Sequence, residues 1–276
     1  MKEIEYNFEI LKFDQQNLKT VPIIINNYNR LEFLDKMLKR LNNMGYHNIY
    51  IIDNNSKYKP LLSYYKKNNL KIFRLKENIG YLSIWESGIS DLFIDGYYIY
   101  SDPDIFPDID CPHDFVDVFK KYLDMFQNLD KVGFGLRIDD LPDHYNLKKN
   151  VILHESKFWE NKICDGLYDA KIDTTFALYR PGAMGPANLT NAGRTDFPYM
   201  AQHLPWYIDH SNLTKEERWY LKCNKIFTHW SNHPENFNFF KKYYLLIKKD
   251  DLPLIWNIRK FGRKVLNLVG IKKKKP

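Results

Sequence analysis

The sequence has few cysteines and no long apolar run. Its three cysteines, Cys111, Cys164 and Cys223, lie far apart, with a spacing typical of neither a disulfide framework nor a metal site. This usage favours a reducing compartment, so we expect a cytoplasmic protein. No apolar run approaches the roughly 18 residues of a membrane span, and the first residues show no apolar segment of a signal peptide. We therefore expect a protein that is soluble or peripheral to a membrane.

Glycine-rich phosphate loops are also missing. No P-loop is present, and Ile138 follows Gly133 and Gly135 where a dinucleotide fingerprint would have its third glycine. The turn at residues 26–30 contains no glycine, whereas a nucleotidyltransferase is expected to carry a glycine-rich loop after its first strand. These absences weigh against P-loop, dinucleotide-binding and nucleotidyltransferase classes.

The chain has enough apolar residues for a sizeable core. Of its 276 residues, 44% are hydrophobic and 16% aromatic, which fits one large domain or one domain with an appendage. We expect a main domain at 1–235 and an aromatic, basic extension at 236–276.

The net charge of +7 is concentrated near the C-terminus. Residues 256–275 interleave apolar side chains with Lys and Arg, a pattern typical of a segment that lies on an anionic membrane. The alternative is a solvated charged end. A non-enzymatic nucleic-acid binder is disfavoured because the body shows no matching basic face.

Apolar strands and helices alternate over the first hundred residues. Continuous apolar runs predict buried strands, and apolar residues at helical spacing predict helices. We expect strands at 21–25, 49–52, 70–75 and 97–100, separated by helices at 31–44, 60–65 and 85–93. This alternation predicts an α/β fold with a Rossmann-like, mostly parallel central sheet flanked by helices.

The pattern is less regular at both ends of this block. Alternation at residues 4–10 predicts an extra strand ahead of the main fold, within residues 1–20. After it we expect a helix at 115–126, strands at 132–138 and 171–180, a loop at 181–194 and a helix at 214–223.

Each predicted strand of the first block ends in polar residues. Parallel strands bring their carboxyl ends to one edge of the sheet, where ligands of open α/β sheets bind. These turns are residues 26–30, 53–56, 77–80 and 101–104. Asn29 could also cap the helix that follows it, and Asp53 could cap the segment after its own strand.

Asp102 and Asp104 follow the strand at 97–100 and are one residue apart. Two hard oxygen ligands suit Mg²⁺ or Mn²⁺, which completes its shell with water and substrate phosphate. The alternative is that Asp102, Pro103 and Asp104 merely form a turn, because Asp and Pro are common turn residues.

Taken in order, the four turns resemble those of bacterial family 2-like glycosyltransferases over roughly residues 20–235. The resemblance implies a GT-A fold, a nucleotide-sugar donor and an Asp-x-Asp motif at Asp102 and Asp104 that binds the metal. It also implies a donor-nucleotide site made of Asn27, Tyr28, Asn29, Arg30, Asp53, Asn55, Asn78, Gly80 and Asp102. By the same analogy we choose His229 as third metal ligand, although an ordinary structural histidine is the alternative.

The later acidic motif of that family is not plain in this chain. We consider Asp173, Asp196 and His203 as candidate catalytic bases. Trp206, Tyr207 and Trp230 could stack on sugar rings or simply be core residues.

The resemblance therefore implies a Mn²⁺- or Mg²⁺-dependent hexosyltransferase. It would move sugar from a UDP- or GDP-sugar to a hydroxyl acceptor, in a surface glycan or lipid-linked oligosaccharide, at the cytoplasmic face of the membrane. No nucleic-acid partner is expected.

The main alternative is a HAD-like phosphohydrolase with Asp102 as nucleophile. The pair Asp139-Asp140 after a strand mimics the late acidic pair of that class. Two features disagree: three αβ units precede Asp102, and Phe106 stands where Thr or Val is expected.

Overall fold

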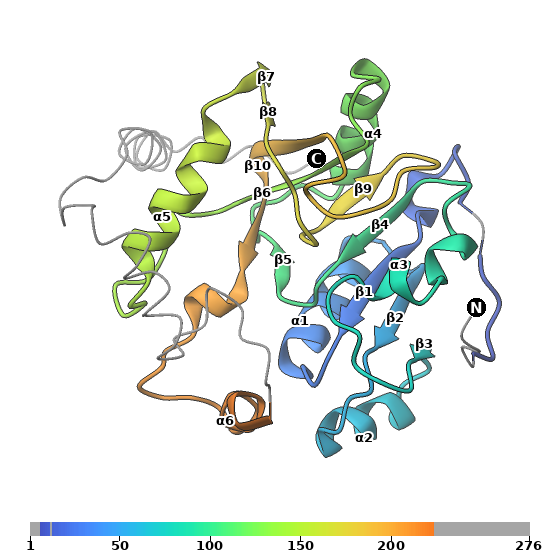
Figure 1. The fold of residues 1–276 in the computed structure, drawn as a ribbon, viewed down its shortest axis with the longest axis vertical. Coiled ribbons are helices and arrows are strands. Elements are labelled where there is room, and N and C mark those ends of the chain that lie inside the picture. The colour runs from blue at the N-terminus through green and yellow to red at the C-terminus, as the bar shows by residue number, and fades with distance from the viewer. Residues whose placement is uncertain (1–5, 12, 224–276) are drawn as a thin grey trace.

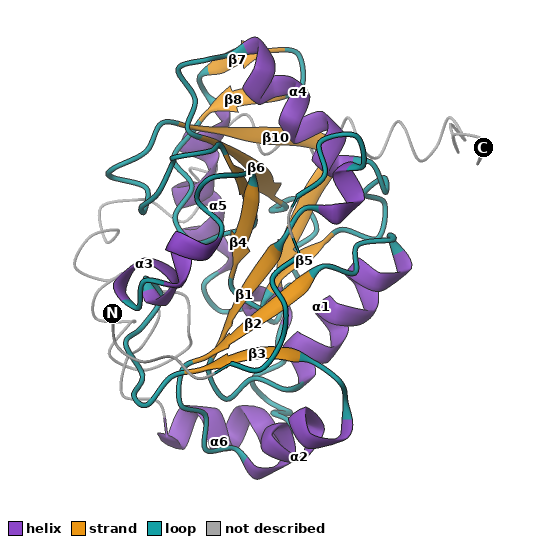
Figure 2. Ribbon diagram, turned by 90° about the vertical axis from the view of Figure 1, so that its right-hand side faces the viewer, coloured by secondary structure: helices purple, strands orange, loops and turns teal. Residues whose placement is uncertain are grey.

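A mixed ten-stranded sheet forms the centre of the molecule (Figure 1). The computed structural model describes residues 6–11 and 13–223. The strand order is β3-β2-β1-β4-β9-β6-β10-β8-β7, and β5 pairs with β10 outside this path. The α/β fold with helices flanking a central sheet is confirmed (Figure 2).

The N-terminal half of the sheet is parallel. Strand β1 (Ile23–Asn27) pairs with β2 (Ile49–Asp53) and β4 (Tyr98–Ser101), and β2 pairs with β3 (Lys71–Arg74). Between these strands the chain forms α1 (Glu32–Asn43), α2 (Lys59–Lys67), α3 (Ser83–Glu86) and η2 (Ile89–Leu92). The register places Asn27 beside Asp53 and Ile25 beside Ser101, so the ends of β1, β2 and β4 lie at one edge.

The C-terminal half of the sheet mixes directions. Strand β9 (Ala177–Tyr179) runs antiparallel between β4 and β6 (Lys131–Leu136). Strand β10 (Ala192–His203) is parallel to β6 and antiparallel to β8 and β5. The remaining elements are η1 (Leu18–Thr20), β5 (Ile105–Pro107), α4 (Phe115–Met125), α5 (Lys148–Ser156), η3 (Lys157–Trp159), β7 (Lys162–Cys164), β8 (Leu167–Asp169), η4 (Leu204–Tyr207) and α6 (Lys215–Cys223).

Side-chain alternation separates two cores on the two faces of the sheet. Ile23 and Ile25 pack into the larger core with residues of α1 and α4. Ile24 lies in the second core with residues of α3 and η2 and with Tyr98 and Tyr100. Because successive side chains of a strand point to opposite faces, the same alternation continues into the polar residues at the strand ends.

Several sequence predictions are wrong in detail. Residues 6–11, the described part of the expected extra strand, form no strand; Phe8 instead packs its ring against Tyr50 and Phe73. The helix expected at 85–93 is interrupted at Gly88, whose φ of 82° is the left-handed conformation that glycine adopts easily.

The region expected to be a long strand and a loop is also different. Only Ala177–Tyr179 of residues 171–180 is a strand, and the loop expected at 181–194 runs into β10. Gly133 and Gly135 are packing residues of β6. A Cβ at Gly133 would clash with the Phe176 carbonyl oxygen, and one at Gly135 with the Trp159 ring.

Helix α6 packs against the N-terminal half of the molecule. It lies beside α2 in both views (Figures 1 and 2), and the Trp219 ring stands 5.0 Å from that of Tyr58, just before α2. In the part of the chain that is described, no helix is long and apolar enough to cross a membrane.

Candidate active site

The ends of β1 and β2, the turn after β3 and the end of β4 meet in one hydrogen-bond network. Asn26 Nδ2 donates to Asp102 Oδ1 over 3.4 Å and to the Gly80 carbonyl over 3.4 Å. Asn54 Nδ2 donates to Asn26 Oδ1 over 2.5 Å and to the Gly80 carbonyl over 3.0 Å. Ser83 Oγ donates to Asn26 Oδ1 over 2.8 Å. The four polar turns therefore converge around Asp102, as the sequence predicts.

The side-chain amides in this network belong to Asn26 and Asn54, whereas the sequence predicts their neighbours Asn27 and Asn55. Asn27 points to the opposite face of the sheet, where its Nδ2 donates to Tyr65 Oη over 2.8 Å. Asn55 donates to the Lys76 carbonyl. Asn78 accepts from the amide of Gly80, so its side chain shapes the turn whose carbonyl lies in the network. The sequence signal that could have found Asn26 and Asn54 is the period of two that they share with Ile24 and Ile52.

Asn29 and Asn55 shape the turns after β1 and β2. Both have positive φ, 58° and 59°, a conformation in which Asn is favoured over other non-glycine residues. Asn29 does not cap α1, contrary to the sequence prediction: its Oδ1 accepts from the amides of Lys57 and Tyr58, ahead of α2. Tyr28 is half-buried.

Asp53 has no exposed side-chain surface. Its Oδ1 accepts from the Ser56 amide, and Arg74 Nε lies 3.7 Å from Oδ2. Burial raises the pKa of Asp53, although Ser56 and Arg74 act in the opposite direction. Contact of this carboxylate with a nucleotide stays a prediction.

Asp102 is held from both halves of the sheet. Besides Asn26, Thr174 Oγ1 donates to its Oδ2 over 2.6 Å, and the Asp102 amide donates to the Thr174 carbonyl over 3.2 Å. Burial and the charge of Asp104 raise the pKa of Asp102, whereas the hydrogen bonds from Thr174 and Asn26 lower it. Like charges that share a site act in this way.

Asp104 has positively charged or chargeable neighbours. His203 Nε2 lies 3.6 Å from Asp104 Oδ2, and β10 pairs His203 with Ile105. Burial acts to raise the pKa of Asp104, but His203 and Arg30 outweigh it and lower that pKa overall. Arg30 in turn pairs with the buried Glu217 of α6.

The candidate bases lie at different distances from this pair. His203 contacts Asp104 directly. Asp173 is exposed and precedes Thr174, the partner of Asp102, and its charge contributes to the raised pKa of Asp102. Asp196 is in β10, at the irregularity between Thr195 and Met200, and its amide donates to the Gly166 carbonyl between β7 and β8. His229 and Trp230 lie outside the described residues, as does the extension at 236–276.

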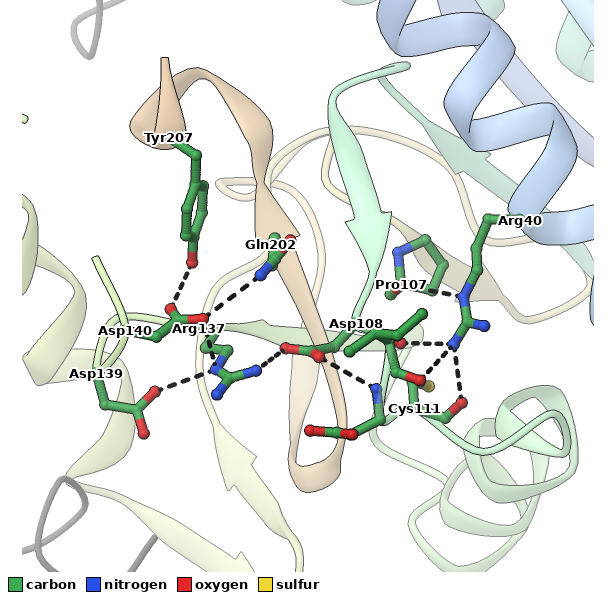
Figure 3. Close-up of polar contacts among 11 residues, drawn as sticks. Arg40, Pro107, Asp108, Cys111, Arg137, Asp139, Asp140, Gln202 and Tyr207 are labelled. Carbon is green, nitrogen blue, oxygen red and sulfur yellow. Dashed lines mark hydrogen bonds and ion pairs between the residues drawn. The ribbon is translucent and has the colours of Figure 1, made fainter. Parts of the chain in front are cut away.

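A second polar cluster braces the segment after Asp104 (Figure 3). Arg137 Nη1 lies 2.7 Å from Asp108 Oδ2, and its Nε lies 2.9 Å from Asp140 Oδ2 and 3.5 Å from Asp139 Oδ1. From α1, Arg40 donates to the carbonyls of Pro107, Asp108, Ile109 and Cys111. Strand β5 and the turn after it are thus held from both sides.

The aromatic candidates for sugar stacking have structural partners. Trp206 is 1% exposed, packs in the larger core and makes an edge contact with the His203 ring at 4.7 Å. Tyr207 Oη donates to Asp140 Oδ1 over 2.6 Å (Figure 3). Trp206 is therefore a core residue.

The donor set at Asp102 and Asp104 suits a divalent cation. Both are hard oxygen ligands, and the repulsion that raises the pKa of Asp102 is what a bound cation would relieve. Among the described residues, no group of three or more His, Cys, Asp and Glu side chains forms a complete metal cage. Mg²⁺ and Mn²⁺ commonly complete such a shell with water and substrate phosphate.

No protein family and no curated protein matches the chain. Among solved structures, S. aureus TarS is 11% identical with a TM-score of 0.40, over 66% of this chain and 36% of that chain. This chain thus spans about a third of that TarS chain's length.

Two further structures give similar values. The structure of S. aureus TarS 1-349 is 12% identical with a TM-score of 0.41, over 89% of this chain and 80% of that chain. A mycobacterial protein is 11% identical with a TM-score of 0.41, over 67% of this chain and 70% of that chain. Likeness at this level supports no inference about activity.

Substitutions can separate the effects of the Thr174 hydrogen bond and of the Asp104 charge on the pKa of Asp102. Thr174→Val removes a hydrogen bond to the carboxylate, so we expect the pKa of Asp102 to rise further. Asp104→Asn removes the neighbouring negative charge, so we expect that pKa to fall. Carbon-detected NMR titration of the aspartate carboxyls in metal-free protein measures both; shifts in the same direction would contradict the assignment.

Proposed function

We propose that this protein is a metal-dependent glycosyltransferase of the hexosyltransferase class, EC 2.4. It transfers a sugar from a nucleotide diphosphate sugar, with UDP or GDP as the nucleotide, to a hydroxyl group of an acceptor. The observation that carries this proposal is the network that joins Asn26, Asn54 and Gly80 to Asp102, with Asp104 beside it. It supports one ligand site at the carboxyl ends of the parallel strands.

Asp102 and Asp104 are the residues that would hold Mn²⁺ or Mg²⁺, with His229 as a third ligand. When bound, the cation supplies Lewis-acid neutralisation of the leaving diphosphate. The polar turns orient the donor around it: Tyr28, Asn29, Arg30, Asp53, Asn55, Asn78 and Gly80 remain the proposed nucleotide-binding set, and Asn26 and Asn54 join it. Asn27 leaves the set because its side chain is buried on the opposite face of the sheet.

Asp173 is our proposed acceptor base. Asp173 is an exposed residue, whereas its neighbour Thr174 is fixed to Asp102, so the base is anchored close to the proposed donor. Partial burial of the carboxyl raises the pKa of Asp173, although the charges of Lys131 and Arg194 act in the opposite direction, and a raised pKa makes the carboxylate a better proton acceptor. Asp196 Oδ1 already accepts from the Phe197 amide over 2.6 Å, and no contact in the described part of the chain ties this residue to Asp102, so it is the weaker candidate.

The phosphohydrolase alternative fits the geometry less well. A phosphohydrolase of this class carries a late acidic pair, for which Asp139 and Asp140 are the candidates. Asp139 and Asp140 pair with Arg137.

The acceptor is proposed to be a surface glycan or a lipid-linked oligosaccharide at the cytoplasmic face of the membrane. The basic amphipathic sequence at 256–275 supports this location.

Nucleotide binding is the first measurement. In calorimetric titrations of UDP and GDP into the full chain, we expect one of them to bind, and only with Mn²⁺ present. Asp102→Ala and Asp104→Ala should abolish this binding while circular dichroism shows an intact fold. Metal-independent binding, or retained binding in both variants, would contradict the site.

The role of Asp173 is tested by Asp173→Asn. We expect this variant to bind nucleotide as the wild type does but to lose about 10²- to 10⁴-fold in kcat, the usual range for a general base. Turnover is measured as nucleotide release from the nucleotide sugar, with water as acceptor. Asp196→Asn is the matched control and should keep its activity; the reverse ranking would move the base to Asp196.

Membrane docking is tested by truncation. The full chain should sediment with anionic liposomes and lose this property at high salt, because exposed charge interactions are screened. A chain ending at Asp251 should remain in solution. Equal sedimentation of the two chains would rule out the basic segment as the anchor.

A further inference from the structure

Helix α6 contacts the turn after β1, where the proposed donor site begins. Two adjacent carboxylates make the contact, and both are buried, Glu216 at 2% and Glu217 at 6% exposure. Both oxygens of Glu216 accept from the amides of Leu31 and Glu32 over 3.0 to 3.2 Å. This carboxylate caps α1, which has no capping side chain of its own.

Glu217 pairs with Arg30, one residue before this cap. The side chains of Arg30 and Glu217 are only 11% and 7% exposed. The guanidinium also lies over the Tyr220 ring, 3.5 Å from its centroid, and 4.9 Å from that of Phe33. Arg30 is therefore enclosed by α6 and the start of α1.

The same guanidinium acts on the carboxylate pair of the site. Arg30 belongs to the turn after β1, the strand whose Asn26 donates to Asp102, and together with His203 it lowers the pKa of Asp104 against the effect of burial. Arg30 thus lies within electrostatic reach of one carboxylate in the proposed metal site and one on α6. Guanidinium groups bind carboxylate and phosphate with the same planar donor geometry.

We propose that α6 is a self-blocking clamp, in which Glu217 occupies the face of Arg30 that a phosphate of the donor takes. Donor binding displaces Glu217 and loosens α6. This inference rests on the proposed function, because the phosphate in question belongs to the nucleotide diphosphate. The clamp adds two features to that site: Glu217 competes with the donor phosphate for Arg30, and α6 moves when the donor binds.

The binding test uses Glu217→Gln in the full chain, titrated with UDP and GDP in the presence of Mn²⁺. Removing the competing charge should tighten nucleotide binding by about tenfold, the size of one charge-assisted hydrogen bond regained. Glu32→Gln is the matched control: it removes the same charge from an exposed neighbour that has no hydrogen bond or ion pair to Arg30, and it should leave the affinity unchanged. Unchanged or weaker binding by Glu217→Gln would overturn the clamp.

Hydrogen exchange tests the movement. Nucleotide and Mn²⁺ should speed exchange at residues 215–223 and at the Leu31 and Glu32 amides of the wild type. Slower exchange there would mean that α6 closes on the donor, which overturns the proposal. If Glu217→Gln does not fold, this wild-type measurement decides alone.

A third arm separates the clamp from the proposed function. Without any nucleotide, Glu217→Gln should already exchange faster than the wild type at residues 215–223, and unchanged exchange would overturn the clamp. If the wild type binds neither nucleotide but this arm behaves as expected, the proposed donor fails and the Arg30–Glu217 restraint stands.

Discussion

The hydrogen bonds to the Asp102 carboxylate join the two halves of this sheet into one site. Asp102 is partly withdrawn from water and lies next to another carboxylate, so it needs hydrogen-bond donors. These donors come from opposite halves of the sheet. Asn26 at the end of β1 supplies one and Thr174, ahead of β9, supplies the other. The parallel half of the sheet and the antiparallel strand β9 must both be in place before Asp102 has its partners.

Most of the N-terminal half could be predicted because its strands are short apolar runs that end in polar turns. Buried parallel strands produce this pattern, so the sequence predicts these strands, their parallel arrangement and the edge of the site, but not their order within the sheet. Successive side chains of a strand point to opposite faces of the sheet, so the position of an amide along the strand decides whether it faces Asp102. Residue type alone predicts Asn27 and Asn55, whereas Asn26 and Asn54 share the face of Ile24 and Ile52 and form the network at Asp102.

The C-terminal half could not be predicted in the same way. Strand β10 begins in a stretch rich in glycine, proline and asparagine and is irregular between Thr195 and Met200, so no regular alternation marks it. The pairing of Glu216 and Glu217 with the start of α1 spans about 185 residues of sequence. A helix rich in Lys, Glu and Arg is normally solvated, and only the tertiary contact shows that two of its carboxylates are buried.

The two sides of Asp104 are restrained by different kinds of interaction. Beyond β5, Arg137 and Arg40 fix the chain through three carboxylates and four backbone carbonyls, a connected network that belongs to the sheet and α1. On the side of Arg30, the restraint comes from a short helix joined through a loop. Removing one partner of a buried ion pair is costly unless another anion replaces it. A phosphate is such an anion, so the same contact that holds α6 in the free protein also provides the route by which a ligand at this site can release it.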